Sequence, residues 1–597
     1  MLATAGSIMA VPTHRRTPAG EVTATGDTGF GQKNRLDMKR KEGKMEKKDR
    51  IHPLIPELKS MMEKGSVTRR DFIRYSALLG LSATAAYQLA GLAFPATAHA
   101  ANIKRGGTMR IATGIQKVTH PAQFSWVEPT NILRQVAEYL TYTDKDNITH
   151  PYLLQKWDAS DDLKTWTLTL RQGIKFNNGD EFNADDVIFS MNQWLNKDVG
   201  SSLLGMMGGY LDAGGIEKVD DHTVRLNLKK SEIAVPEHLF HYPAMVLNHR
   251  TFEGDFIKAP HGTGPYTLEV YKESERAVLK RRTDYWQKGA DGDPLPYMDG
   301  MEFVDMGDEM SPRIAAIQAG EIDMIDLATT GGTSAYKALK DDKRVQVKPI
   351  GTAQARVLRM RVDLKPWDDN RVRMALKLCQ HREKILGLAY FGQGLLAQDF
   401  HVAPVHPEYC NKPIPKYDPQ KAKQLLKEAG YPNGLKVNLA VGSEWTDVVR
   451  YAEILKQDAA PAGFNVVLQT MPTSQYWEKW TEVDLGVTPW THRPLGTMVL
   501  NLAYINGADG KPVPWNETNW ADPEFSKLLE EANGTLNVDD RRKIFCKLEQ
   551  IQWDRGSIGI AWWQNNWQVV TNRVQDSQPH PTGYMLFNKV WLSKMKS

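Results

Sequence analysis

Hydrophobic and polar residues alternate along short stretches of this chain, and stretches with helical signals lie between them. Residues 165–171 alternate over seven positions, which predicts a strand with one buried face. Residues 435–439 predict another strand. Residues 418–429, which are closed by Gly430, and residues 447–459 indicate helices. The pattern therefore predicts alternating helices and strands, which is typical of α/β packing.

Turn and capping residues separate these elements. Asn183 is a predicted helix N-cap, followed by acidic residues in the first turn. The segment Gly264-Pro265-Tyr266 opens a predicted strand to Tyr271, which returns over residues 276–280. Residues 369–387 predict one long helix, and residues 465–469 predict a further strand.

An export signal is predicted near the N-terminus. Arg69 and Arg70 precede a mildly apolar run over residues 77–94, and the small-x-small sequence that ends in Ala98 and Ala100 follows. A basic segment, an apolar segment and a cleavage site occur in the order of a signal peptide, and the paired arginines indicate the twin-arginine route. A membrane anchor is the weaker alternative, because polar residues interrupt the apolar run.

This signal predicts the compartment of the mature protein. We expect cleavage near Ala100, a mature chain that begins near Ala101, and a location free in a Gram-negative periplasm, because no cysteine at the cleavage site offers lipid attachment. The stretch before Met45 predicts disorder or an over-called start.

Composition argues against a nucleic-acid partner. The chain has 597 residues, which predicts more than one domain, and a formal charge of +4. Its first 100 residues hold 16 Lys and Arg against 9 Asp and Glu, whereas the remainder holds 59 against 62. The basic surplus thus belongs to the leader, and the mature chain has no basic excess for a polyanion.

Several ordered segments of the mature chain resemble the extracellular solute-binding family 5. They are Gly106 to Ala112; Trp157, Asp161-Asp162, Trp166, Lys175-Phe176, Gly179 and Asp185-Asp186-Val187; Gly262 to Tyr266; Asp284-Tyr285-Trp286; Asp369 to Leu376; and Tyr417-Asp418-Pro419 through Leu425-Leu426 to Ala429-Gly430-Tyr431-Pro432. Together they cover nearly all of the mature chain in the order of the family.

The resemblance implies an α/β fold of the type II periplasmic binding protein class, cluster C, with two lobes joined by a two-stranded hinge. It also implies an extra domain inserted in the first lobe. The implied divisions are a leader (1–100), lobe I (101–143, 271–351 and a C-terminal return over 561–597), the inserted domain (144–270) and lobe II (352–560).

Catalytic and metal-binding motifs were also sought. The sequence contains no HExxH, GxSxG, Walker A loop or GxGxxG opening a helix, so we predict that the chain is not an enzyme and needs no cofactor. His401, His406 and Cys410 form the most metal-like cluster, but their spacing matches no known motif and favours an extended loop near the cleft. Among Cys379, Cys410 and Cys546, one disulfide is possible, and the sequence does not choose it.

The richest candidate binding segment is residues 488–494. Trp490 and Thr491 could cover a ligand, while His492 and Arg493 stand where the family's dipeptide receptors place an acidic anchor for the ligand's amino terminus. We therefore expect a carboxylated or anionic ligand, held by the Arg493 guanidinium. The alternative is that Trp490 belongs to the core and Arg493 forms a surface salt bridge.

Other residues are candidates for the cleft. Arg356 and Arg359 lie on a predicted strand leading out of the hinge, although a solvated strand face explains them equally well. The aromatic candidates for the cleft walls are Trp126, Phe400, Tyr476, Trp477 and Trp515.

The resemblance and these residues predict a monomeric, periplasmic substrate-binding protein for a peptide or peptide-like, carboxylated small solute. Its expected partners are the membrane permease and the ATPase of an ABC importer, and the twin-arginine translocase during export. The alternatives are a twin-arginine-exported metal or haem receptor and a secreted enzyme.

Overall fold

A long mixed sheet organises the fold. The computed structural model describes residues 51–93, 103–124, 127–327, 332–507, 509–535 and 537–593. The strand order of the sheet is β15-β14-β16-β12-β17-β11-β1-β10-β9-β8, and β13 pairs with β17. Its strands are β1 (Thr108–Ala112), β8 (Tyr266–Lys272), β9 (Arg276–Arg281), β10 (Gly300–Val304), β11 (Met324–Ile325), β12 (Val345–Met360), β13 (Gly394–Leu396), β14 (Leu435–Gly442), β15 (Phe464–Met471), β16 (Leu485–Trp490) and β17 (Ile558–Thr571).

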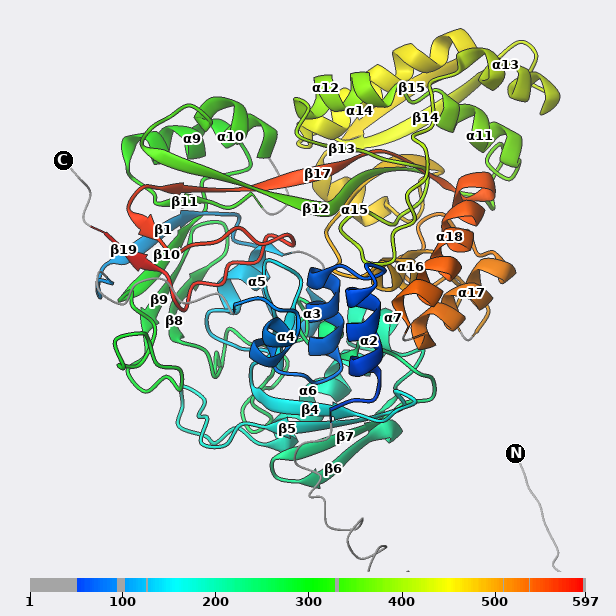
Figure 1. The fold of residues 1–597 in the computed structure, drawn as a ribbon. Helices are drawn as coiled ribbons and strands as arrows, with labels where there is room; N and C mark the ends of the chain where they lie inside the picture. The colour runs from blue at the N-terminus through cyan, green and yellow to red at the C-terminus, as the bar shows by residue number, and fades with distance from the viewer. Residues whose placement is uncertain are drawn as a thin grey trace, which may run out of the picture. The chain divides into compact units, whose positions relative to one another are not determined.

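Two long antiparallel strands, β12 and β17, run through the middle of this sheet (Figure 1). Strands β1 and β8–β11 lie on one side of the pair, and β14–β16 lie on the other. We call the first side lobe I, with helices α9 (Met310–Ala319) and α10 (Gly332–Leu339). The second side is lobe II, with α11 (Asn370–Leu378), α12 (Arg382–Tyr390), α13 (Pro419–Glu428), α14 (Thr446–Ala459), η5 (Ala460–Ala462) and α15 (Thr473–Lys479).

A second sheet, with strand order β4-β5-β7-β6, builds the region between β3 and β8, which we call the inserted domain. Its elements are β4 (Leu154–Ala159), β5 (Thr165–Leu170), α6 (Ala184–Leu195), α7 (Ser202–Met207), η4 (Ala213–Gly215), β6 (Ile216–Asp220), β7 (Thr223–Asn227) and α8 (Val235–His238). Asn183 caps α6 in a capping box with Asp186, as its sequence predicts.

The remaining elements connect these regions. They are η3 (Pro121–Gln123), α5 (Glu128–Leu133), β2 (Thr141–Thr143), β3 (Thr149–Pro151), α16 (Gly496–Ala503), α17 (Pro523–Gly534), α18 (Val538–Arg555), β18 (Val574–Gln575) and β19 (Trp591–Leu592). Helices α16 and α17 pack on each other, α16 packs on α7, and α18 packs on α11. This group therefore links the inserted domain to lobe II.

Within the described residues, the helices that precede β1 are α2 (Leu54–Glu63), α3 (Arg69–Leu78) and α4 (Ala83–Leu89). Arg69 and Arg70 lie in the first turn of α3, and Phe72 and Leu78 of the same helix are fully buried. Ala98 and Ala100 lie outside the described residues, as does the stretch before Met45. Within the described ranges, no helix is long and apolar enough to cross a membrane.

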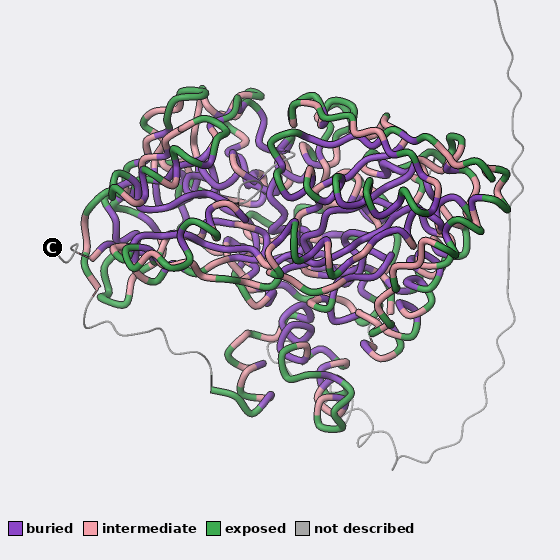
Figure 2. Tube along the Cα trace, turned by 90° about the horizontal axis from the view of Figure 1, so that it is seen from above, coloured by how far each residue is buried: buried purple, intermediate pink, exposed green. Residues whose placement is uncertain are grey.

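Most predicted elements are present, and one is divided. Residues 369–387 predict a single helix, but the structure has α11 and α12 with a break at Cys379–His381. The break is stabilised locally, because the His381 side chain accepts a hydrogen bond from the backbone of Lys384 and so caps α12. Figure 2 shows buried chain through the inside of the fold and exposed chain along its outer turns. The boundaries at residues 143, 270, 351 and 560 stay predictions.

Candidate binding cleft

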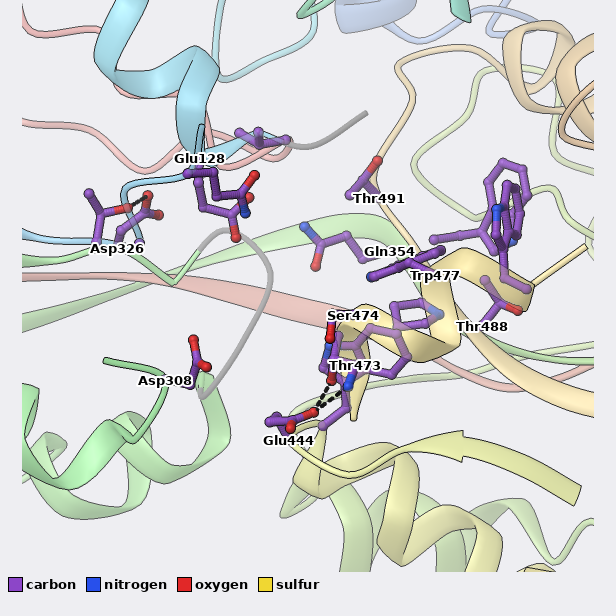
Figure 3. A pocket seen from close by; sticks show the side chains of 18 of the residues that line it. Glu128, Asp308, Asp326, Gln354, Glu444, Thr473, Ser474, Trp477, Thr488 and Thr491 are labelled. Carbon is purple, nitrogen blue, oxygen red and sulfur yellow. Dashed lines mark hydrogen bonds between the residues drawn. The ribbon is translucent and has the colours of Figure 1, made fainter. Parts of the chain in front are cut away.

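A cavity of about 610 Å³ lies between lobe I and lobe II. Lobe I and α5 contribute Thr113, Glu128, Asp308, Arg313 and Asp326, whereas lobe II and the segment after β16 contribute most of the aromatic lining (Figure 3). A ligand in this cavity would contact both lobes. A concave, largely aromatic site with a few charged groups is typical of small-molecule binding.

Five tryptophans form a continuous wall of edge-to-face contacts along lobe II. Their ring centroids lie 5.3 Å apart for Trp445 and Trp477, 5.6 Å for Trp477 and Trp480, 5.7 Å for Trp480 and Trp515, and 5.8 Å for Trp515 and Trp490. All five line the cavity. We call this set the tryptophan wall. Edge-to-face pairs stabilise one another, so the wall presents a fixed apolar surface.

A buried carboxylate, Glu517, fixes the end of this wall. It accepts hydrogen bonds from Trp490 Nε1 at 2.7 Å and from Thr488 Oγ1 at 2.5 Å. Arg359 Nε lies 3.3 Å from the same carboxylate. Burial raises the pKa of Glu517, and the Arg359 guanidinium opposes that effect. Arg359 thus lies behind the wall, where it also donates to the carbonyls of Trp480 and Val483.

Acidic groups face the wall from lobe I. Figure 3 shows Glu128, Asp308 and Asp326 on the side of the cavity opposite Trp477. Asp326 accepts a hydrogen bond from Thr113 Oγ1 at 2.9 Å. Asp308 is exposed in the loop before α9. This side of the cleft therefore offers carboxylates to a cationic group of a ligand.

Lobe II adds one more carboxylate at the edge of the wall. Glu444 accepts hydrogen bonds from the Thr473 hydroxyl and from its backbone N–H, the latter at 2.7 Å. Partial burial tends to raise the pKa of Glu444, but these hydrogen bonds outweigh it and lower the pKa. Glu444 is therefore ionised at neutral pH.

Two arginines line the same cleft. Arg356 Nε donates to Asp447 at 2.7 Å, and Asp447 also accepts from Gln564, so the Arg356 charge is already matched. Arg313 is buried in α9 and donates through Nη2 to the Gly307 carbonyl at 2.5 Å, whereas its Nε makes no hydrogen bond within the described residues. Arg313 forms no ion pair within the described residues, so its positive charge suits an anionic group of a ligand.

The structure brings only part of the predicted site together. Trp490, Thr491, Arg356 and Trp515 line the cleft. Arg359, as described above, lies behind the wall, and Trp126 lies outside the described residues. Phe400 is fully buried among Tyr409 and Trp553, away from the cleft lining.

His492 and Arg493 also lie beside the cleft and not among its lining residues. His492 accepts a hydrogen bond from the Ala353 N–H through Nδ1, and its Nε2 lies 3.0 Å from Asn147 Oδ1. Burial holds the pKa of His492 well below its usual value, so the ring is neutral. Arg493 Nη1 donates to Thr491 Oγ1 at 2.6 Å, and its guanidinium lies over the Tyr242 ring. Arg493 therefore contacts the cleft through two of its lining residues, Thr491 and Tyr242.

The metal-like cluster is divided among other contacts. His401 Nδ1 lies 2.7 Å from the Tyr504 hydroxyl, His406 Nε2 donates to the Arg493 carbonyl, and Cys410 is joined to Cys546 by a disulfide. Across the described ranges, no group of three or more His, Cys, Asp or Glu side chains is placed to hold a metal ion.

Sequence reasoning missed several cleft residues: Glu128, Asp308, Arg313, Asp326, Glu444, Trp445 and Trp480. Trp480 could have been predicted from the sequence, because it follows the cleft candidate Trp477 by three positions, and residues at that spacing share one face of a helix. The carboxylates carried none, since isolated acids on loops are common on any surface.

Comparisons with known proteins agree with this architecture. Residues 149–510 match the model of the bacterial extracellular solute-binding proteins, family 5 Middle. The chain is 27% identical over 486 residues to di/tripeptide-binding protein 1 of Pseudomonas aeruginosa (strain UCBPP-PA14), covering 74% of this chain and 86% of that protein.

Solved structures show the same fold. One of them is DppA, an ABC transporter-associated periplasmic binding protein from Helicobacter pylori, in complex with peptide STSA. DppA is 23% identical to this chain, with a TM-score of 0.71, and the alignment covers 82% of this chain and 99% of DppA. AgaA of A. tumefaciens R10, in complex with agropinic acid, is 20% identical, with a TM-score of 0.73 and the same coverages. The predicted α/β, two-lobed periplasmic binding protein fold is confirmed.

Proposed function

Because the chain belongs to family 5 of the bacterial extracellular solute-binding proteins, we propose that it is the periplasmic receptor of an ABC importer for a peptide or peptide-like solute that carries a carboxylate. The named relatives are substrate-binding receptors and not enzymes. The sequence has no phosphate-binding loop, so a separate ATPase would supply the energy for transport.

The observation that carries this proposal is the tryptophan wall facing charged groups of both signs. Asp308 and Glu444 lie on opposite lobes and suit an ammonium group, whereas the positive charge of Arg313 suits a carboxylate. The wall suits an apolar side chain between them. A zwitterionic, peptide-like ligand with an apolar side chain combines these three features.

The relatives support the same ligand class. One is described as a di/tripeptide-binding protein, one structure contains a peptide, and one contains agropinic acid. A ligand that contacts both lobes binds the closed arrangement better and shifts the population toward it. The closed receptor would then dock on the permease.

The proposed compartment has two sources of support. The Cys410–Cys546 disulfide suits an oxidising compartment, where such bonds persist. The paired arginines Arg69 and Arg70 precede an apolar run, which suits export by the twin-arginine translocase.

A thermal-shift screen tests the proposal. The purified protein would be heated with peptides, opines, amino acids, sugars and nickel in parallel, because any ligand that binds only the folded state raises the melting temperature. We expect peptides or opines with an apolar side chain and a free carboxylate to give the largest increase. A large increase with nickel or sugars, and none with peptides or opines, would overturn the proposed ligand class.

A further inference from the structure

The N-terminal helices α2–α4 pack on the turn between β2 and β3 and on the adjoining inserted domain through one set of contacts. Arg70 forms an ion pair with Asp146 at 2.6 Å, and Arg74 Nε donates to the Asn147 carbonyl at 3.1 Å. Trp157 Nε1 donates to the Leu78 carbonyl at 2.9 Å. Arg74 and Trp157 are both buried, so the contact between these helices and the rest of the protein is a packed interface and more than a surface ion pair.

A second set of contacts joins the same helices to α18 and to the loop before α13. The Tyr75 hydroxyl donates to Glu408 at 3.1 Å, and the Arg541 guanidinium lies 4.5 Å from the Tyr75 ring centroid. Arg542 Nη1 donates to the Ser66 carbonyl at 2.6 Å. Tyr75, Glu408 and Arg541 are each at most 1% exposed.

Helix α3 therefore contacts two separate regions on its two sides. Arg74 contacts the turn between β2 and β3, beside the inserted domain, and the next residue, Tyr75, contacts α18. A cavity of about 750 Å³ lies between α3 and the central strand β12, lined by Thr68, Pro349 and Gly351 among others. The N-terminal end of α3 thus lies across this cavity from β12.

We propose that α2–α4 act as a strap that ties the inserted domain to α18 and restricts lobe motion for as long as the segment stays attached. The proposal rests on the proposed function only in that lobe motion serves ligand binding. If the leader is cleaved near Ala100, the strap leaves with it. The precursor would then be the restrained form and the exported protein the mobile one.

Two glycines offer a matched pair of variants. Gly80 (φ +89°) and Gly91 (φ +69°) both have left-handed backbone, so alanine costs a similar strain at each. A Cβ at Gly80 would lie 2.8 Å from the Trp157 carbonyl oxygen, whereas a Cβ at Gly91 meets nothing within 4 Å. Gly80→Ala therefore disturbs docking on the inserted domain, and Gly91→Ala controls for strain.

The test uses the full chain and no ligand, so its outcome is independent of which solute binds. Hydrogen exchange of the α3 amides reports docking. Spin labels at Lys164→Cys, in the inserted domain, and Lys423→Cys, in α13, report the distance between the inserted domain and lobe II. Both sites are exposed, Cys379 is buried, and the other two cysteines form the disulfide.

We expect Gly80→Ala to speed α3 exchange on the order of 10-fold or more and to broaden the distance distribution, and Gly91→Ala to change neither. Faster exchange of the α3 amides in Gly80→Ala, together with an unchanged distribution of spin-label distances, would overturn the strap proposal. The proposal would also fail if the α3 amides of the wild type exchange as freely as those of an unfolded peptide. If the α3 amides of Gly80→Ala stay protected from exchange, Leu78→Asp replaces it as the test variant, because it places a carboxylate in the buried contact. The same two measurements are then made on Leu78→Asp, and the same results support or overturn the proposal.

Discussion

At the scale of single residues, Trp477 is a central member of the tryptophan wall that lines the cleft. It is half-buried and lies between Trp445 and Trp480. We expect Trp477→Ala to weaken binding on the order of 10- to 100-fold, because the ligand loses an apolar face that it buries. Titration followed by tryptophan fluorescence measures the loss.

The control for this variant is Trp591→Ala. Trp591 is also half-buried, but it lies in β19 and its Nε1 donates to Asp576, away from the cleft. We expect wild-type affinity from this control. Equal affinities for the two variants would show that the wall does not contact the ligand.

Asp308 provides a test of charge. If it receives the ammonium group of a peptide, Asp308→Asn should weaken binding of a free-amine peptide about 10-fold or more, since a charge-assisted hydrogen bond contributes about 1.5–3 kcal/mol. An N-acetylated form of the same peptide should bind both proteins equally. Glu309→Gln, which alters the neighbouring exposed carboxylate outside the cleft lining, is the matched control. The charge assignment fails if Asp308→Asn affects both peptide forms alike.

The sequence predicted residues of the candidate site where suitable side chains lay in a segment that resembles the binding segment of family 5. The resemblance to family 5 indicates residues 488–494 as a binding segment, and Trp490 and Thr491 of this segment line the cleft. His492 and Arg493 were placed in the cleft by the same reasoning, but the chain turns after Thr491 and buries both side chains. Asp308 and Glu444 line the same cavity because the two lobes face each other, and no local sequence pattern predicts that arrangement.

At the scale of elements, alternating strands and capped helices could be predicted because their signals are local. Asn183 and Asp418 each cap the helix that their sequence predicts. The division between α11 and α12 could not be predicted. It depends on Gln380, whose side chain bonds Asp399 across 19 positions, and on the cap at His381.

Helix α18 offers a pH test through Glu549. Burial raises the pKa of this carboxyl to about 9, so the folded protein holds its proton at neutral pH while the unfolded chain releases it. A raised folded pKa contributes stability that is complete below the unfolded pKa of about 4.5 and is lost as pH rises toward 9. We expect Glu549→Gln, which mimics the protonated form, to be more stable than wild type at pH 8 by up to about 5 kcal/mol.

Urea unfolding at pH 4.5 and pH 8 measures this effect. The gain from Glu549→Gln should fall to about 0.4 kcal/mol at pH 4.5, where the folded wild type holds the proton and about half of the unfolded molecules do. A stability difference that is the same at both pH values would mean that Glu549 does not titrate in this way.

The disulfide joins α18 to the loop before α13 and closes a segment of 136 residues. Its loss frees the unfolded chain, so Cys410→Ser with Cys546→Ser should lower the free energy of unfolding by about 2–5 kcal/mol. Reducing agent should destabilise the wild type and leave the double variant unaffected. Cys379→Ala, which removes the buried free thiol, should retain the sensitivity to reduction.

Export depends on the first turn of α3 if the leader prediction is correct. Lysine at both Arg69 and Arg70 keeps the charge but removes the guanidinium pair, so we expect precursor to accumulate in the cytoplasm. Fractionation of cells that express the two proteins measures the distribution. Normal periplasmic accumulation of the lysine variant would refute the twin-arginine assignment.

At the scale of the whole molecule, the two lobes face each other across a cleft that only both lobes together complete. Lobe I and α5 supply the opposing carboxylates and Arg313, and lobe II with its adjoining segment supplies the tryptophan wall. A ligand that engages both sides stabilises their approach, and the energy of each contact then favours the closed form. The fold class followed from sequence, but the chemistry of the cleft required the relative placement of the lobes.

The most direct test of this account is a calorimetric titration of the purified protein with the peptide that gives the largest thermal shift. Its N-acetylated and C-amidated forms should be titrated in parallel. We expect the free peptide to bind at about 10 μM or tighter and each blocked form to bind on the order of 10-fold more weakly, because each loses one charge-assisted contact. Equal affinity for the free and blocked forms, or no measurable binding by any peptide, would contradict the account.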